Sequence, residues 1–178
     1  MPNHKPLPVD PIAEARRQWI SHGWGDAADG MAAVTSVMRA HQLMLAEVDR
    51  ALKPFGLTFA RYETLRLLAF TRNGQMPMAS ATARLQVHPA SVTNIVDRLE
   101  RDGLVERAPH PHDGRAAMLI LTDAGRALAE ETTMVLNDEV FKRIGLDDED
   151  LGALVSTIAR FRRGAGDFED PRPLPDPL

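Results

Sequence analysis

The order of elements expected between residues 78 and 121 limits the possible folds more than any other feature. In sequence order, apolar periodicity and turn residues predict a helix at 78–85, a helix at 89–102, a strand at 104–108 and a strand at 117–121. Gly103 ends the second helix where a left-handed backbone is usually needed, and a polar turn at 109–115 joins the strands. A two-stranded hairpin is marginally stable alone, so we expect it to pack on the neighbouring helices as a winged helix-turn-helix.

Helices are also expected on both sides of this segment. Asp10 and Pro11 are typical of a helix start and predict a helix at 11–22. Three glycines then indicate a linker before a long helix at 31–52, which Pro54 and Gly56 end and whose length suits a scaffold or dimerisation role. Its apolar residues recur at spacings of three, four or seven: Met31, Val34, Met38, Leu45, Val48 and Leu52. Further helices are predicted at 58–70, 122–144 and 147–163.

These elements predict a mainly α fold with a small β-hairpin wing (α+β), in which a winged helix-turn-helix lobe joins a helical dimerisation domain. We expect four parts: an N-terminal extension with one short helix at 1–29, a helical dimerisation domain at 30–57 and 123–163, a winged lobe at 58–122, and a Pro-rich tail at 164–178.

Composition and charge exclude several classes of protein. The chain has no cysteine, which removes disulfides, thiolate metal sites and cysteine nucleophiles. It has no secretory signal pattern and no apolar run near the roughly 18 residues of a membrane span, so a cytoplasmic protein is expected. The net charge is −4, but residues 58–122 hold eight Lys and Arg against six Asp and Glu. A positive middle in a negative chain favours contact with nucleic acid through that lobe.

The second helix of the motif has two different faces. Val92, Ile95, Val96 and Leu99 form an apolar stripe, which leaves a small, polar first turn on the outer face. Such a face suits entry into a major groove, because small polar side chains can approach base edges and phosphates. The candidate DNA-binding residues of the helices and the wing are Ser80, Pro89, Ala90, Ser91, Thr93, Asn94, Arg98, His110, His112, Asp113 and Arg115.

An arginine on the tip of a hairpin suits a minor groove, where the potential of DNA is most negative. Asp113 can orient Arg115 by a bidentate hydrogen bond. Other interpretations stay open: the pair can be a surface ion pair of little consequence, and the winged helix can be a module that binds protein. His110 and His112 suggest metal, but no third ligand follows at a usual spacing, so we expect neither metal nor cofactor.

Three motifs in this order resemble the multiple-antibiotic-resistance repressor (MarR) family. They are LQVHPASVTNIVDRLERDGLV from Leu85 to Val105, DGR at 113–115 and LTDAGR at 121–126. The resemblance covers about 30–163, and it implies a homodimer whose two lobes read half-sites of a pseudo-palindromic operator in double-stranded DNA. It also implies a pocket between the dimer domain and each lobe for a small effector, such as an aromatic acid or an acyl-CoA thioester. The lack of cysteine excludes thiol-based oxidant sensing.

Effector-binding candidates lie on the helices that would line this pocket. Together with one residue of the N-terminal helix, they are Trp19, Met38, His41, Gln42, Leu45, Tyr62, Arg66 and Phe70. Trp19 is similar to a tryptophan of the urate-responsive subgroup, where Glu63 could supply the required acid, but Ile95 stands where that subgroup has an arginine. Alternatively, Trp19 and Ile20 only brace the dimer interface.

The leading hypothesis is therefore a transcriptional repressor that a small ligand releases from its operator. A DNA-binding regulator without a ligand and a winged-helix protein-interaction module are the alternatives. No enzyme is expected, because the chain contains no nucleophile–base constellation, phosphate loop or metal-ligand spacing.

Overall fold

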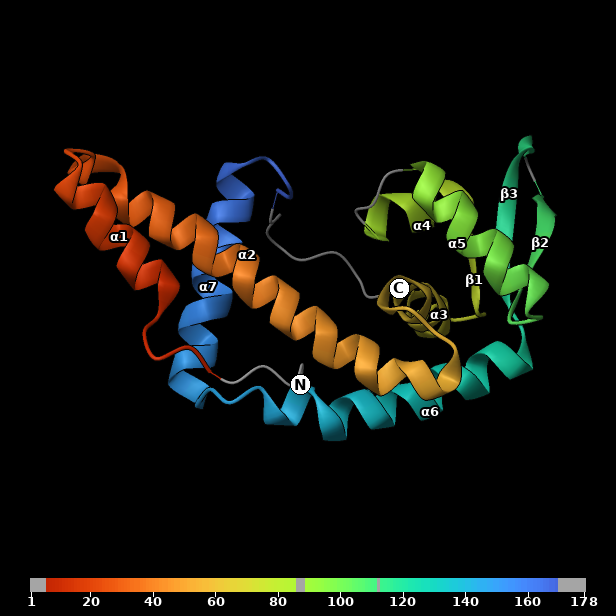
Figure 1. The fold of residues 1–178 in the computed structure, drawn as a ribbon. Coiled ribbons are helices and arrows are strands. Elements are labelled where there is room, and N and C mark those ends of the chain that lie inside the picture. The colour runs from red at the N-terminus through yellow and green to blue at the C-terminus, as the bar shows by residue number, and fades with distance from the viewer. Residues whose placement is uncertain (1–5, 86–88, 112, 170–178) are drawn as a thin grey trace. The chain divides into compact units, whose positions relative to one another are not determined.

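The chain folds as two compact units, Met1–Phe59 and Ala60–Leu178. The computed structural model describes residues 6–85, 89–111 and 113–169, with the side chains of 89 and 113–115 outside the description. Within these ranges the chain forms seven α-helices, two short 3-10 helices and one three-stranded antiparallel sheet (Figure 1). The expected mainly helical class with a small β wing is confirmed.

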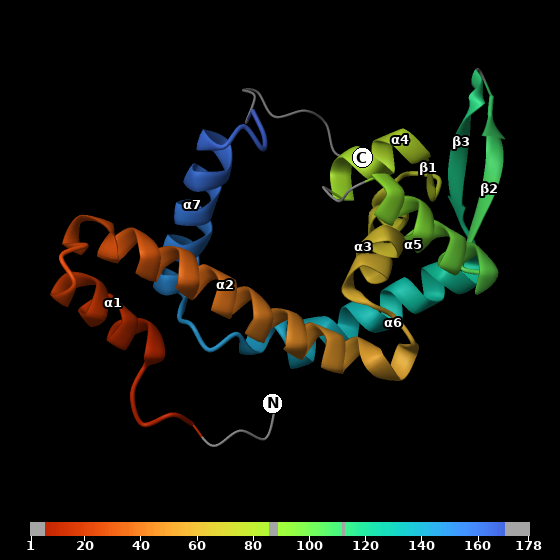
Figure 2. The same cartoon turned by 45° about the horizontal axis from the view of Figure 1, so that its top comes forward.

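The first unit is a pair of helices, α1 (Pro11–Ser21) and α2 (Gly25–Leu52). The Asp10 carboxylate accepts a hydrogen bond from the Ile12 amide at 2.9 Å, so the predicted cap of α1 is confirmed. α1 packs along the first part of α2, as both views of the ribbon show (Figures 1 and 2). A 3-10 helix, Lys53–Phe55, and Gly56 at φ 66° end α2 as expected.

The linker expected before α2 is wrong, because α2 already begins at Gly25. Asp26 stands in its first turn, where an acid complements the helix dipole. Ala28 is 1% exposed, so this turn is held by burial as well as by local preference. Gly30 lies inside the helix, where glycine costs about 1 kcal/mol relative to alanine and does not forbid the structure.

The second unit begins with the elements of the winged lobe. They are α3 (Phe59–Phe70), β1 (Gln75–Pro77), α4 (Met78–Leu85), α5 (Pro89–Arg101), β2 (Val105–His110) and β3 (Asp113–Leu121). The helices match their predicted ranges to within a residue, and the break expected at 86–88 lies outside the described residues. The side chains that form the lobe core are buried: Tyr62, Leu65, Leu68, Ala81, Val92, Val96, Leu99, Val105 and Leu119.

The sheet differs from the expected hairpin in two ways. β1 adds a third strand, in the order β1-β3-β2, and Met76 pairs with Leu119. The polar turn predicted at 109–115 is wrong, because β2 extends to His110 and β3 starts at Asp113. These two residues pair after a register shift between Pro109 and His110. Cross-strand backbone pairing therefore overrides the low strand preference of this segment.

Two longer helices complete the second unit. α6 (Asp123–Glu139) ends before the predicted residue 144, because Val140 leaves the helical conformation and a 3-10 helix, Phe141–Arg143, follows. α7 (Asp148–Gly164) starts where it was predicted, with the Asp147 carboxylate accepting from the Asp150 amide at 2.9 Å. None of the helices in the described ranges combines the length and hydrophobicity that a membrane crossing requires.

The junction between the wing and α6 is packed through a glycine. Thr122 caps α6: its hydroxyl accepts from the Gly125 amide at 3.0 Å and donates to the Gly103 carbonyl at 2.9 Å. A Cβ on Gly125 would overlap the carbonyl oxygen of Leu104 and lie 2.8 Å from Leu121 Cδ1. The LTDAG motif thus fixes the end of β3, the start of α6 and the residue before β2 against one another.

Candidate nucleic-acid interface

The two faces predicted for the second helix of the motif are confirmed in α5. Val92, Val96 and Leu99 are each 0% exposed and belong to the lobe core, whereas Ile95, the fourth residue of the predicted stripe, is part-buried. On the opposite side, the small side chains of the first turns and one arginine further along are exposed. These are Ala90, Ser91, Thr93, Asn94 and Arg98, of which Ala90 and Thr93 take part in further interactions. α5 therefore has one exposed, mostly polar face and one apolar face that is buried in the lobe core.

The remaining DNA-binding candidates lie around this helix. Ser80 is part-buried on α4, and His110 is part-buried at the end of β2. Asp113 and Arg115 belong to β3, so they lie on a strand and not in a loop as predicted. The side chains of Pro89, Asp113 and Arg115, and all of His112, lie outside the described residues.

The far end of α5 is held by α3. Arg61, whose side chain is 11% exposed, reaches from α3 to the Asp102 carboxylate in a close ion pair. Gly103 follows at φ 69°, and the Leu104 amide donates back to the Leu99 carbonyl at 2.9 Å. This closure is the left-handed cap that the sequence predicted, and it directs the chain into β2.

A second set of ion pairs, which sequence reasoning missed, joins α5 to the wing. Arg107 on β2 donates from Nη2 to Asp97 Oδ1 and from Nη1 to Glu100 Oε2, both at 2.6 Å. The spacing of three between Asp97 and Glu100 places both carboxylates on one side of the helix. Only the packing of β2 beside α5, visible in Figure 1, brings an arginine of the next element to them.

The effector candidates fall in both units. Met38, His41, Gln42 and Leu45 follow one another along one side of α2, where Met38 is 64% exposed and Leu45 is part-buried. Gln42 accepts a hydrogen bond from Arg39 at 3.1 Å. Trp19 on α1 is part-buried, and its ring lies edge-on to that of Trp24 with centroids 5.5 Å apart.

On α3, the candidates differ in burial. Tyr62 is 6% exposed, and its hydroxyl lies 3.1 Å from that of Thr133 on α6, which makes it part of the core. The Arg66 guanidinium lies 4.3 Å above the Phe70 ring, and Phe70 is 62% exposed. Arg66 Nε is buried and has no hydrogen-bond partner among the described residues. Burial raises the pKa of the nearby Glu63 carboxyl above its usual value.

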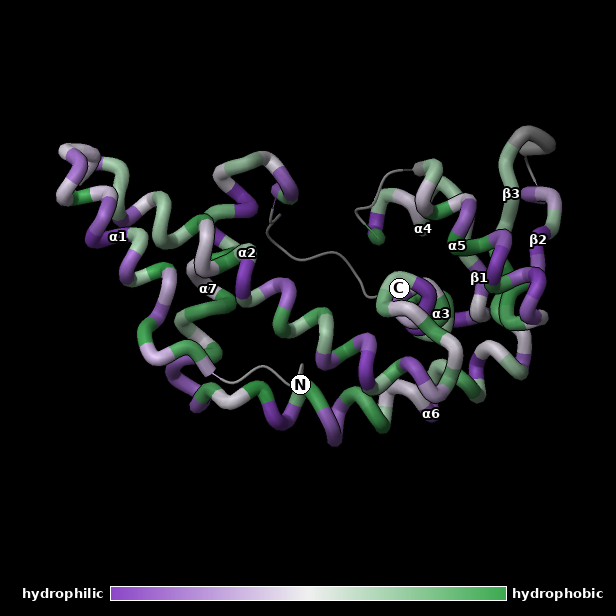
Figure 3. The backbone as a smooth tube through the Cα atoms, in the orientation of Figure 1, coloured by the Kyte–Doolittle hydropathy of each residue, from purple (hydrophilic) through white to green (hydrophobic). Residues whose placement is uncertain are grey.

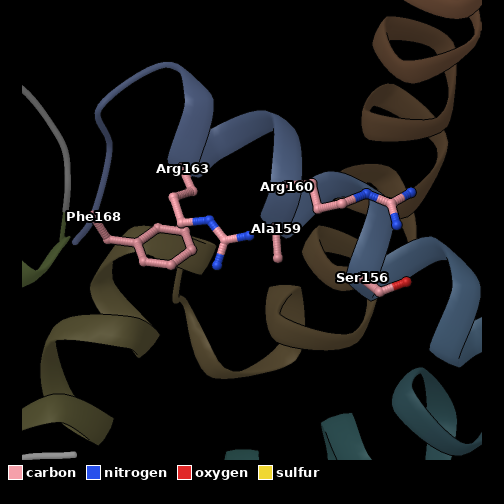
Figure 4. Close-up of a pocket in the computed structure, with 5 residues that line it drawn as sticks. All are labelled: Ser156, Ala159, Arg160, Arg163 and Phe168. Atoms are coloured by element: carbon pink, nitrogen blue, oxygen red, sulfur yellow. The ribbon is translucent and has the colours of Figure 1, made fainter. Parts of the chain in front are cut away.

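A shallow cavity of about 360 Å³ lies elsewhere, on α7. Figure 4 shows the residues that line it: Ser156, Ala159, Arg160, Arg163 and Phe168. None of these is a sequence candidate. Among the described residues, no group of three or more His, Cys, Asp or Glu side chains is placed to hold a metal ion.

Comparisons with known proteins converge on one family. A family model described as "MarR family" matches residues 55–116. Sco5413, a MarR family transcriptional regulator from Streptomyces coelicolor, is 46% identical with a TM-score of 0.73 and covers 80% of this chain and 99% of its own. The transcriptional repressor CouR, solved bound to a 23-mer DNA duplex, is 25% identical with a TM-score of 0.65 over 71% of this chain and 89% of its own.

A curated relative is similar at the level of sequence. The HTH-type transcriptional repressor IacR of Pseudomonas putida is 30% identical over 105 residues, which are 59% of this chain and 61% of IacR. The chain spans 51–61% of the length of the first curated relatives that it matches.

Proposed function

The chain belongs to the MarR family of transcriptional regulators, and we propose that it is a homodimeric repressor that a small ligand releases from a pseudo-palindromic operator. The observation that carries the DNA-binding part is α5, whose polar face with Ser91, Asn94 and Arg98 lies over fully buried valines and a leucine. Such a helix can enter a major groove without losing its core contacts. The description of IacR as a repressor and the DNA complex of CouR support this proposal.

The dimer part of the proposal rests on exposed apolar side chains outside the lobe. Val34, Val37 and Met38 on α2 are 51–64% exposed, and Val155 and Phe161 on α7 are 66% and 75% exposed. A second copy that covers these surfaces would remove apolar area from water, at roughly 25 cal/mol per Å². We therefore assign 30–57 and 123–163 to dimerisation and 58–122 to DNA binding.

The DNA-binding proposal is tested by footprinting the DNA upstream of the protein's own gene. We expect a protected site with two-fold related halves, and an affinity that falls steeply as salt rises. Asn94→Ala should weaken binding to this site by about 1–3 kcal/mol, as for the loss of a base contact. The control is Gln18→Ala, which removes an exposed amide of α1 outside the segments assigned to DNA binding and to dimerisation. Absence of any protected site, with salt-insensitive binding, would favour the protein-interaction module.

The wing is tested separately through Arg115. Arg115→Ala should weaken binding to all DNA sequences to a similar degree, because a minor-groove arginine mainly reads electrostatic potential. A variant that binds the protected site as tightly as the parent would show that the wing assignment is wrong.

The effector part of the proposal centres on Arg66. A cation stacked on an exposed ring, with a buried Nε that lacks a partner among the described residues, suits an aromatic carboxylate. Salicylate, benzoate, 4-coumarate and an acyl-CoA are the probes, with thermal shift and operator release as readouts. Arg66→Ala should abolish both responses, and Arg72→Ala, an exposed arginine beyond α3, should keep them. Flat responses of the parent would favour a regulator without a ligand.

A further inference from the structure

We propose that Arg107 is a positioning residue for DNA recognition, which clamps β2 of the wing to α5 so that both engage the DNA with a fixed spacing. This inference rests on the proposed function. Arg107 touches no candidate DNA-binding residue in the described contacts, and it acts through the elements that carry them. The contacts that support the proposal all lie within the second unit.

The clamp has a defined geometry. The two terminal nitrogens of one guanidinium bind two carboxylates one helical turn apart, each at 2.6 Å. The Arg107 side chain is 28% exposed, against 48% for Asp97 and 41% for Glu100, so the cation is the least exposed member. A planar guanidinium with divergent donors holds two acceptors in a fixed arrangement, which a single ammonium group cannot do.

The ion pairs of Arg107 attach an edge strand of the sheet to α5. The strand order β1-β3-β2 makes β2 an edge strand of the described sheet. β2 therefore pairs with a strand along one edge only, that of β3, and it also packs against α5. Val105, 1% exposed, anchors the start of β2 in the core. Arg107 lies two residues further toward the wing tip and extends this attachment along the strand.

The charges on α5 are otherwise hard to reconcile with DNA binding. Asp97 lies one turn beyond Asn94 on the exposed side of the helix, and Glu100 lies one turn beyond Asp97. Two carboxylates on a helix that approaches phosphates would repel them. Their pairing with Arg107 accounts for these acids. They weaken the electrostatic attraction between α5 and DNA, but they hold the wing in a fixed position.

The deciding test is the double variant Asp97→Ala/Glu100→Ala, measured on the duplex that the parent selects from a randomised library. Removing two negative charges should strengthen binding if repulsion dominates. A clamp predicts the opposite, a loss of about tenfold in affinity, which corresponds to about 1.4 kcal/mol. Arg107→Ala should lose a similar factor, and Arg107→Lys should recover part of it by reaching one carboxylate. Asp29→Ala, which breaks the 2.6 Å ion pair between α2 and Arg16 of α1, lies outside the segments assigned to DNA binding and to dimerisation and is the control.

Hydroxyl-radical footprinting at saturating protein distinguishes positioning from general destabilisation. We expect the variants to keep the central protection made by α5 and to lose the flanking protection made by the wing. Uniform loss of protection, or tighter binding by the double variant, would overturn the inference. The parent's own binding separates the two proposals: if it selects no duplex, the proposed function fails, whereas equal affinity of parent and variants refutes only the clamp.

Discussion

The winged lobe and the flanking helices differ in how far their apolar side chains are buried. Within the lobe, seven large aliphatic residues of α3, α5 and the sheet are almost completely buried: Leu65, Leu68, Val92, Val96, Leu99, Val105 and Leu119. By contrast, residues 11–21 of α1 and 148–164 of α7 contain no buried residue. Hydrophobic residues recur along α2 and α7 as they do in the lobe (Figure 3), so the difference lies in their cover and not in composition.

This difference teaches that a single chain completes the core of the lobe but leaves α1 and α7 without a buried residue. The apolar residues of α7 recur at spacings of three and four, which is the pattern of a helix with one buried face. A surface of this kind on a protein that stays in solution usually marks an interface. We infer that one chain buries the whole core of the lobe, and that a second copy covers the exposed apolar side chains of the other helices.

Gly125→Ala should break the lobe and has the largest expected effect. Its new Cβ would overlap the Leu104 carbonyl oxygen, a backbone atom that cannot rotate away. We expect a loss of about 3 kcal/mol in the free energy of unfolding, at the upper end of overpacking substitutions. Urea denaturation followed by circular dichroism measures it.

Gly152→Ala is the matched control for that prediction, because Gly152 lies in α7 and its new Cβ would meet nothing within 4 Å. Alanine there should increase stability by about 0.5–1 kcal/mol through helix propensity. Equal effects of the two substitutions would contradict the contrast between a packed lobe and an open helix.

Val155→Asp should affect assembly and not the lobe. Val155 is 66% exposed, so an aspartate costs little in a single chain but places a charge in the proposed interface. We expect the dimer dissociation constant to rise at least about 100-fold, which corresponds to about 2.7 kcal/mol. Sedimentation velocity across a concentration series measures it. Ser156→Asp adds the same charge about 100° further around α7, away from the apolar stripe, and should leave the association unchanged.

The sequence predicted the lobe well where local signals are strong. The apolar stripe of α5, the glycine after it and the capping residues Asp10, Thr122 and Asp147 each depend on a few neighbouring residues. β1 was missed because three residues, one of them a proline, carry no strand period. Only pairing with β3, more than forty residues later, defines β1 as a strand.

The candidate site could be predicted in part for the same reason. The polar face of α5 follows from helical spacing, whereas the Arg107 clamp depends on where β2 packs. A sequence shows that Asp97 and Glu100 share one side of a helix, but not which cation they meet. The Arg66–Phe70 contact spans one helical turn and is predictable by spacing alone.

Glu63→Gln has the smallest expected effect and tests a part-buried side chain of α3. Burial raises the pKa of this half-buried carboxyl above its ordinary 4.5, so the protonated form is favoured in the folded protein. The parent is therefore relatively more stable below pH 4.5 and loses stability as the pH rises through the raised pKa. Glutamine should make the protein more stable at pH 7, by less than about 1 kcal/mol, and have no such effect at low pH. Urea midpoints at both pH values test this sign.

The most direct test of the central claim is the mass of the complex between the protein and its selected duplex, by sedimentation equilibrium. If one chain forms a complete lobe and a second copy covers the exposed helices, the protein mass should be twice 19.6 kDa. This mass is expected both for the free protein and for the protein bound to one duplex with two half-sites. Val155→Asp should reduce the free protein to one chain with its lobe still folded. A parent that sediments as a single 19.6 kDa chain in both states would contradict the account.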